Sequence, residues 1–289
     1  MRKIAKRVFV LFLAVSFLMT LSLTGMCARM TVDEIANEQI VDLTKYIDGL
    51  VLANGAFPMN KPSITGFVTT QLETIDGVAP EVYTKWPSGK IVPYFSELAI
   101  LGMLKTSPEQ AKAPTERFIG WYISHLNDKS SDINGVDGTV YDYYCFVDPA
   151  DSNHIIEVTL RKLNEHKYLD KPSENPNDYD STDSYAACFI RVLYEYYQNY
   201  GGDFLADKKD SVLRILNALK STYVSDLGLT GAKPNYMVCY LMDNCEVYDG
   251  LVAASKLFDE LYGDKELANE LAEMADTVKA SPPAATTPI

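Results

Sequence analysis

The second half of the chain carries a succession of long helical patterns, most of which begin beside an acidic residue and end at a glycine or a turn. The spacing of apolar residues predicts helices over Thr182–Tyr200, Asp203–Tyr223, Asp243–Tyr262 and Asp264–Lys279. Glycines follow the first and third of these helices, as is common at helix C-termini. Helices joined by short turns form αα-hairpins, which stack side by side. The chain is therefore expected to be all-α, with short β-hairpins in its loops.

A weak internal repeat indicates which helical arrangement to expect. Asp180 and Asp183 precede Asp243 and Glu246 by 63 positions, and similar aromatic and acidic residues end the helices that follow. Repeated hairpins of this length favour a toroid, in which equivalent helix ends meet at one mouth. Six such hairpins need more than the 289 residues of the chain, so we expect an incomplete αα-hairpin toroid over residues 29–280.

The first half of the chain has weaker patterns. Residues 55–90 are rich in Pro, Gly and Thr and predict loops with short strands. Turn signals predict a hairpin or an extended loop over Asp132–Asp148. Residues 149–180 are expected to be mostly irregular, with one short element near Ile155–Leu163. Helices are predicted over Val32–Ala53, Pro93–Lys105 and Glu109–Asn127.

The two ends of the chain are expected to lie outside this domain. Residues 1–28 combine basic residues, an apolar run from Val8 to Leu23 and a small residue at a plausible cleavage point, which is typical of a secretory signal. An uncleaved anchor and a lipid attached at Cys27 are the alternatives. A signal predicts a secreted, extracellular protein with no other membrane contact. The Pro- and Thr-rich residues 281–289 predict a disordered tail.

Composition and motifs exclude several functional classes. The chain has 26 Lys and Arg against 39 Asp and Glu, so its formal net charge is −13, and removal of residues 1–28 makes it −17. A chain this acidic lacks the basic surface that nucleic acid binding requires. The sequence has no phosphate-binding glycine loop, no zinc-protease motif and no Cys/His metal spacing, so neither a cofactor nor a metal is expected.

Carboxylates recur near the predicted helix starts, at Glu97, Asp180, Asp183, Asp243 and Glu246. Any one of them can act as a cap that satisfies free backbone N–H groups. In a toroid they would instead share a cleft, where one protonated and one ionised carboxyl perform general acid/base catalysis. Aromatic residues near these helix ends suit a sugar ring as well as a hydrophobic core. The candidates for substrate binding are Asp180, Tyr94, Trp121, Tyr141, Tyr185 and Tyr236, and those for catalysis are Glu97, Asp183, Asp243 and Glu246.

Three segments resemble motifs of glycoside hydrolase family eight, the bacterial cellulases, chitosanases and xylanases. They are Ser96-Glu97 with Leu101-Gly102-Met103, the run Ser181-Thr182-Asp183-Ser184-Tyr185-Ala186-Ala187, and Lys233-Pro234-Asn235-Tyr236. The resemblance spans residues 40–260 and keeps the family's chain order. It implies a six-hairpin (α/α) toroid, a carbohydrate substrate, Glu97 as the general acid and Asp183 as the residue that holds the central sugar. Asp243 and Glu246 are the candidates for the base by their position in the repeat.

The resulting hypothesis is a secreted hydrolase that cleaves O-glycosyl bonds of a polysaccharide or oligosaccharide with inversion. A non-catalytic glycan-binding module on the same fold is one alternative, which binding without turnover would reveal. A polysaccharide lyase or a sugar epimerase is another. Epimerases of this shape rely on histidine, and His125, His154 and His166 all lie away from the predicted inner helix starts. A lyase for an acidic polymer needs positive charge, which this chain supplies sparingly.

Overall fold

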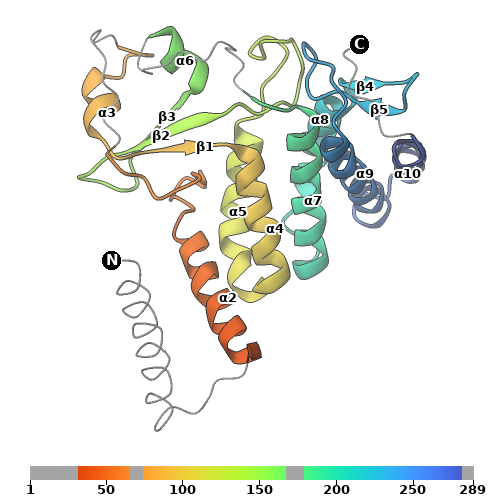
Figure 1. Cartoon of the computed structure of the whole chain (residues 1–289), viewed down its shortest axis with the longest axis horizontal. Coiled ribbons are helices and arrows are strands. Elements are labelled where there is room, and N and C mark those ends of the chain that lie inside the picture. The colour runs from red at the N-terminus through yellow and green to blue at the C-terminus, as the bar shows by residue number, and fades with distance from the viewer. Residues whose placement is uncertain (1–31, 65–73, 167–178, 282–289) are drawn as a thin grey trace, which may run out of the picture. The chain divides into compact units, whose positions relative to one another are not determined.

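The computed structural model describes residues 32–64, 74–166 and 179–281, and over these ranges the protein is predominantly helical with small antiparallel sheets (Figure 1). Helix α2 (Val32–Asp48) crosses the boundary between two units of the chain, Met1–Leu43 and Thr44–Ile289. The other described helices and strands belong to the second unit. The predicted signal segment 1–28 and residues 282–289 of the predicted tail lie outside the described residues.

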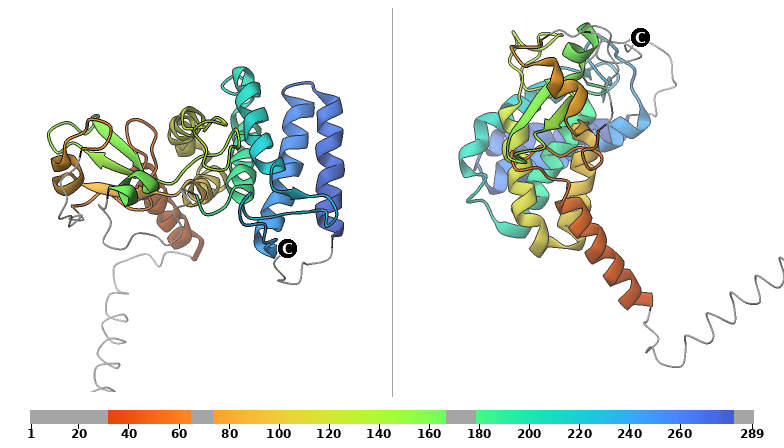
Figure 2. Two further views of the ribbon diagram at one scale, coloured as in Figure 1. Left: turned by 90° about the horizontal axis from the view of Figure 1, so that it is seen from above. Right: turned by 90° about the vertical axis from the view of Figure 1, so that its left-hand side faces the viewer.

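The helical part of the second unit contains three αα-hairpins in a row (Figure 2). Helix α7 packs against both α4 and α9, so the first helices of the three hairpins lie in succession. The predicted helix positions are confirmed, with ends that differ by a few residues. The predicted helix Asp203–Tyr223 is interrupted at its start by the 3-10 turn η2 (Ala206–Lys208). The hairpins are α4 (Pro93–Thr106) with α5 (Pro108–Ser124), α7 (Asp183–Tyr200) with α8 (Lys209–Lys220), and α9 (Leu241–Glu260) with α10 (Lys265–Ala280).

The turns between these helices follow from their residues. Proline opens both α4 and α5, where the missing N–H is no loss because the first turn has no intrahelical acceptor for it. Gly201 ends α7 with a φ of 81°, a left-handed conformation that glycine adopts without strain. The Asp264 carboxylate accepts the Leu267 N–H at 3.3 Å and begins α10.

Helices α7 and α9 approach each other closely at Gly250. A Cβ atom at this position would lie 2.7 Å from the Cα atom and 2.8 Å from the carbonyl oxygen of Ala187. These distances are shorter than van der Waals contact, and the backbone of a packed helix cannot move aside freely. The absence of a side chain at Gly250 therefore lets the two helices pack against each other.

We expect Gly250→Ala to lower the free energy of unfolding by about 1–3 kcal/mol, because the added methyl group overpacks the α7–α9 contact. Gly120→Ala in α5 is the matched control, since a Cβ atom there meets nothing within 4 Å. The control should raise the free energy of unfolding by about 0.5–1 kcal/mol through helix propensity. Urea unfolding measures both variants, and effects of the same sign would contradict the close approach.

A small antiparallel sheet is formed by one strand before α4 and two strands after α5. Its strands β1 (Ser88–Ile91), β2 (Tyr143–Val147) and β3 (Ile155–Thr159) lie in that order. The short helices α3 (Pro80–Lys85) and α6 (Leu160–Glu165) pack beside it around a second core of Ile75, Tyr83, Phe146, Val158 and Leu163. A separate hairpin of β4 (Tyr223–Val224) and β5 (Leu229–Thr230) follows α8. The all-α expectation is thus confirmed only in the coarser sense of a mainly helical protein.

One expectation for the first half of the second unit is wrong, because helix α3 lies in residues 55–90, where loops and strands were expected. For Asp132–Asp148 the extended loop is confirmed over residues 132–142, whereas the hairpin is not, because β2 pairs with strands that lie outside this segment. Instead, the Asp132 carboxylate accepts the Asn134 and Val136 N–H groups at 2.9 Å each and the Thr139 hydroxyl at 2.7 Å. The loop folds around this buried carboxylate, which satisfies the backbone groups that a strand would have paired.

Candidate active site

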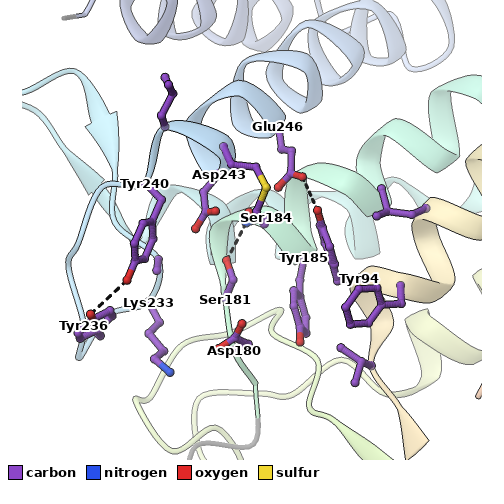
Figure 3. Close-up of a pocket in the computed structure, with 16 residues that line it drawn as sticks. Tyr94, Asp180, Ser181, Ser184, Tyr185, Lys233, Tyr236, Tyr240, Asp243 and Glu246 are labelled. Atoms are coloured by element: carbon purple, nitrogen blue, oxygen red, sulfur yellow. Dashed lines mark hydrogen bonds between the residues drawn. The ribbon is translucent and has the colours of Figure 1, made fainter. Parts of the chain in front are cut away.

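The first turns of α4, α7 and α9 and the loop before α9 surround a pocket of about 910 Å³ (Figure 3). A pocket of this volume suits a small molecule or a few sugar rings. Both carboxylate and aromatic side chains face it, and they come from elements far apart in the chain. Its lining residues are Val92, Tyr94, Phe95, Leu98, Asp180, Ser181, Ser184, Tyr185, Ala232, Lys233, Tyr236, Tyr240, Leu241, Met242, Asp243 and Glu246.

Helix α9 supplies two carboxylates to the pocket. Asp243 lies in its first turn and Glu246 one turn later, so both side chains project from one helix face. The Asp243 side chain is almost fully buried, with 7% of its surface exposed. Burial, followed by the charges of Glu246 and Asp180, raises the pKa of Asp243 to about 6. Asp243 therefore exchanges a proton near neutral pH, as a general acid must.

Glu246 is held in place by Tyr94 from the first turn of α4. The Tyr94 hydroxyl donates a hydrogen bond to Glu246 Oε1 at 2.6 Å, and the Tyr94 ring stacks on Tyr185 with centroids 6.3 Å apart. Burial and the hydrogen bond to Glu246 raise the pKa of Tyr94, so its phenol remains a donor. Glu246 Oε2 is buried and has no hydrogen-bond partner within the described ranges. Glu246 is therefore fixed beside Asp243, and its charge contributes to the raised pKa of that carboxyl.

The remaining polar part of the pocket is more open. Asp180 is exposed and lies just before α7. Tyr236 and Tyr240 are 48% and 41% exposed, and their hydroxyl oxygens lie 3.2 Å apart. Together these two tyrosines form an aromatic flank that a planar or ring-shaped ligand can cover.

Glu97, the predicted general acid, does not line the pocket. It is fully buried on α4, and neither of its carboxyl oxygens has a hydrogen-bond partner in the described part of the chain. Burial, with a smaller contribution from the charge of Glu246, raises the pKa of Glu97 well above its ordinary value. Burial therefore favours the protonated, neutral form of the Glu97 carboxyl, and Glu97 is not among the residues that line the pocket.

Asp183, predicted to hold a sugar, also lies outside the pocket lining, at the buried start of α7. Its Oδ1 accepts hydrogen bonds from the Ser181 hydroxyl at 2.6 Å and the Ser184 N–H at 2.8 Å, and its Oδ2 accepts one from the Thr230 hydroxyl at 2.7 Å. Burial nevertheless raises the pKa of Asp183 to about 7. Because its oxygens bond within the protein, Asp183 joins α7 to β5 rather than facing a ligand.

Two of the predicted aromatic residues also lie elsewhere. Trp121 Nε1 donates a hydrogen bond to Glu157 Oε1 at 2.8 Å, and this bond joins α5 to β3. The Trp121 ring stacks on His125. Tyr141 is buried and stacks on Tyr179 with centroids 5.5 Å apart. The structure brings the other predicted residues together in the pocket, namely Tyr94, Asp180, Tyr185, Tyr236, Asp243 and Glu246.

Several residues line the pocket although their sequence context predicted no role for them, among them Lys233, Ser184 and Met242. Lys233 opens the Lys233–Tyr236 motif, so the pattern contained a signal for it. Apolar residues such as Met242 carry no signal that separates a pocket wall from a core.

No family model matches the chain, and neither a curated protein nor a solved structure matches it. Within residues 32–64, 74–166 and 179–281, no helix is long and apolar enough to cross a membrane. The same ranges contain no group of three or more His, Cys, Asp or Glu residues placed to hold a metal ion.

Proposed function

We propose that the protein is a secreted glycoside hydrolase that cleaves the O-glycosyl bonds of a polysaccharide or oligosaccharide. The observation that carries this proposal is the placement of Asp243, a nearly buried carboxyl with a raised pKa, in a pocket with aromatic walls. Aromatic rings cover the C–H faces of sugars, and carboxylates accept hydrogen bonds from sugar hydroxyls. Two further carboxylates, Asp180 and Glu246, line the same pocket.

Each carboxylate has a distinct role in the proposed reaction. Asp243 donates its proton to the leaving oxygen, in place of Glu97, which is sealed away from the pocket. Glu246, oriented by Tyr94, keeps the proton on Asp243 and stabilises positive charge on the sugar in the transition state. Asp180 is exposed and activates a water molecule, which gives inversion of configuration.

The wider assignment rests on the arrangement of helices and on the N-terminal sequence. The succession of α4, α7 and α9, whose first turns all reach the pocket, supports an incomplete αα-hairpin toroid with these as its inner helices. The basic and apolar pattern of residues 1–28 supports export, either as a secreted protein or with a lipid at Cys27.

A non-catalytic glycan-binding module is the second candidate function. The burial of Glu97 favours it, because the resemblance assigns the acid to a residue that cannot touch a ligand here. Such a module keeps the aromatic flank of Tyr236 and Tyr240 and binds sugars without cleaving them. An epimerase has less support, because no histidine is among the described residues that line the pocket and His125 bonds to Glu157 at 2.9 Å.

A panel of β-linked glycans incubated with the full chain tests the two candidates. We expect release of reducing ends, with the inverted anomer as the first product in proton NMR. Tyr240→Ala should weaken glycan binding by about 3- to 10-fold through the loss of ring contact. Tyr46→Ala is the matched control, since Tyr46 is a 56% exposed tyrosine outside the pocket lining. Binding without release supports the binding module, and an absence of both contradicts both candidates.

A further inference from the structure

Lys233 carries the positive charge of the pocket. Among the described residues that line it, no other lysine or arginine is present. Lys233 is only 4% exposed and lies in the loop before α9, where its backbone pairs with Tyr236 through hydrogen bonds of 3.2 and 2.8 Å. Figure 3 shows its side chain extending from this loop away from Asp243 and Glu246. The paired backbone thus holds Lys233 in the pocket wall, and its side chain points away from Asp243 and Glu246.

This ammonium group has no anionic partner within the described ranges. Most of the ion pairs that lysines form there join exposed or half-exposed side chains, such as Lys209 with Asp264, and none involves Lys233. Lys233 Nζ lies over the Tyr236 ring, 5.9 Å from its centroid, at the outer limit of a cation–π interaction. The Lys233 ammonium group thus faces the pocket without a carboxylate beside it in the described ranges, so this arrangement favours an incoming anion.

The carboxylates of the pocket do not form an ion pair with Lys233. None of Asp180, Asp243 and Glu246 lies within salt-bridge distance of Lys233 Nζ, although all three line the same pocket. Glu246 is engaged by Tyr94, and Asp243 is the residue that carries a proton. The positive and negative groups are therefore kept apart, as a ligand with both hydroxyl groups and a negative charge requires.

We infer that Lys233 binds a singly negative substituent of the sugar, a uronate carboxylate or a sulfate ester, so that the pocket takes an acidic glycan. This inference rests on the proposed function, because it names the substrate class of the same pocket. Lys233 donates a charge-assisted hydrogen bond to this substituent, which is stronger than a hydrogen bond to a neutral hydroxyl group. A neutral glycan leaves the ammonium group unpaired and binds more weakly for that reason.

Calorimetric titration of the full chain with three probes tests the inference. The probes are an oligoglucuronate, the same oligosaccharide after reduction of its carboxyl groups to alcohols, and the reduced oligosaccharide after addition of sulfate esters. We expect the wild type to bind one anionic probe at least about tenfold more tightly than the reduced one. Lys233→Met keeps the aliphatic stem and should abolish this preference, with affinity for the reduced probe changed by less than about twofold. Lys233→Arg should retain the preference.

The outcomes separate this inference from the proposed function. The inference is overturned if the wild type binds the reduced oligosaccharide as tightly as, or more tightly than, both anionic probes, and this test needs no folded variant. An equal loss of affinity for all probes in Lys233→Met also overturns it, because that result marks the lysine as structural. A preference for the anionic probe that Lys233→Met abolishes upholds the inference. If that preference comes with an unsaturated product, or with no release of reducing ends, the inference stands and the hydrolase proposal falls.

Discussion

Replacement of Asp243 by Asn should lower the kcat of glycan hydrolysis by about 10³-fold, within the range that general acid catalysis contributes. The amide keeps the size and most of the polarity of the side chain, but it cannot transfer a proton to the leaving oxygen. Glycan affinity should change little, because the aromatic walls of the pocket remain. The measurement is the steady-state release of reducing ends, with the binding constant determined separately.

Two variants make this prediction specific. Asp249→Asn is the matched control on the same helix, since Asp249 pairs with Arg191 and does not line the pocket, and it should retain hydrolysis. Glu97→Gln tests whether the buried carboxyl, and not the one in the pocket, is the general acid. If Glu97→Gln abolishes hydrolysis at every pH and Asp243→Asn does not, then the family resemblance identifies the acid correctly and the assignment of Asp243 is wrong.

The free energy of unfolding should fall as the pH rises from about 5 to about 8, the reverse of ordinary acid denaturation. Burial raises the pKa of Asp142 and Asp243 to about 6 and that of Asp183 to about 7, and it raises the pKa of Glu97 further. Each group binds more protons in the folded chain than in the unfolded chain over this window. Stability is therefore greatest below the unfolded values and is lost as the pH passes the folded ones. The deprotonation of Asp183 alone accounts for a loss of at most about 4 kcal/mol of unfolding free energy.

Glu97→Gln provides the test of this pH dependence. Glu97 makes no hydrogen bond within the described residues, so an amide of the same size removes the ionisable group at little structural cost. The variant should resemble the wild type at about pH 5 and exceed it in unfolding free energy at about pH 8. Urea titrations at both values measure the difference. A wild type that grows more stable with rising pH, or a variant with an unchanged slope, would contradict this account.

The helices of the second unit were predictable from the sequence, whereas the sheet was not. Apolar periodicity, the prolines before α4 and α5 and the glycines after α7 and α9 act locally, so they fix helix positions without knowledge of the rest of the fold. Strand β1 has no such local signal. It pairs with β2, whose partner residues lie more than fifty positions away, and no pattern within either strand specifies that pairing.

The sequence predicts which residues reach the pocket only where the position of a residue on its helix decides whether its side chain is exposed. Asp243 and Glu246 follow one face of α9 and reach the pocket, as the repeat suggested. Glu97 lies on the same face of α4 as the buried residues Ile100 and Leu104, so its helical position places it in the core even though the motif assigned it catalysis. Asp183 also matched a motif, but the hydroxyl of Thr230, which captures its carboxylate, comes from a distant hairpin.

The α4–α5 hairpin occupies the chain between the two paired strands β1 and β2. Helical hairpins form through local contacts in microseconds to milliseconds, while pairing of distant strands must first overcome the entropy of closing the intervening chain. Formation of α4 and α5 shortens that chain and draws its ends together. The sheet should therefore assemble after the hairpin, and mutations that loosen the turn at Ser107 should slow the folding of strands that they never touch.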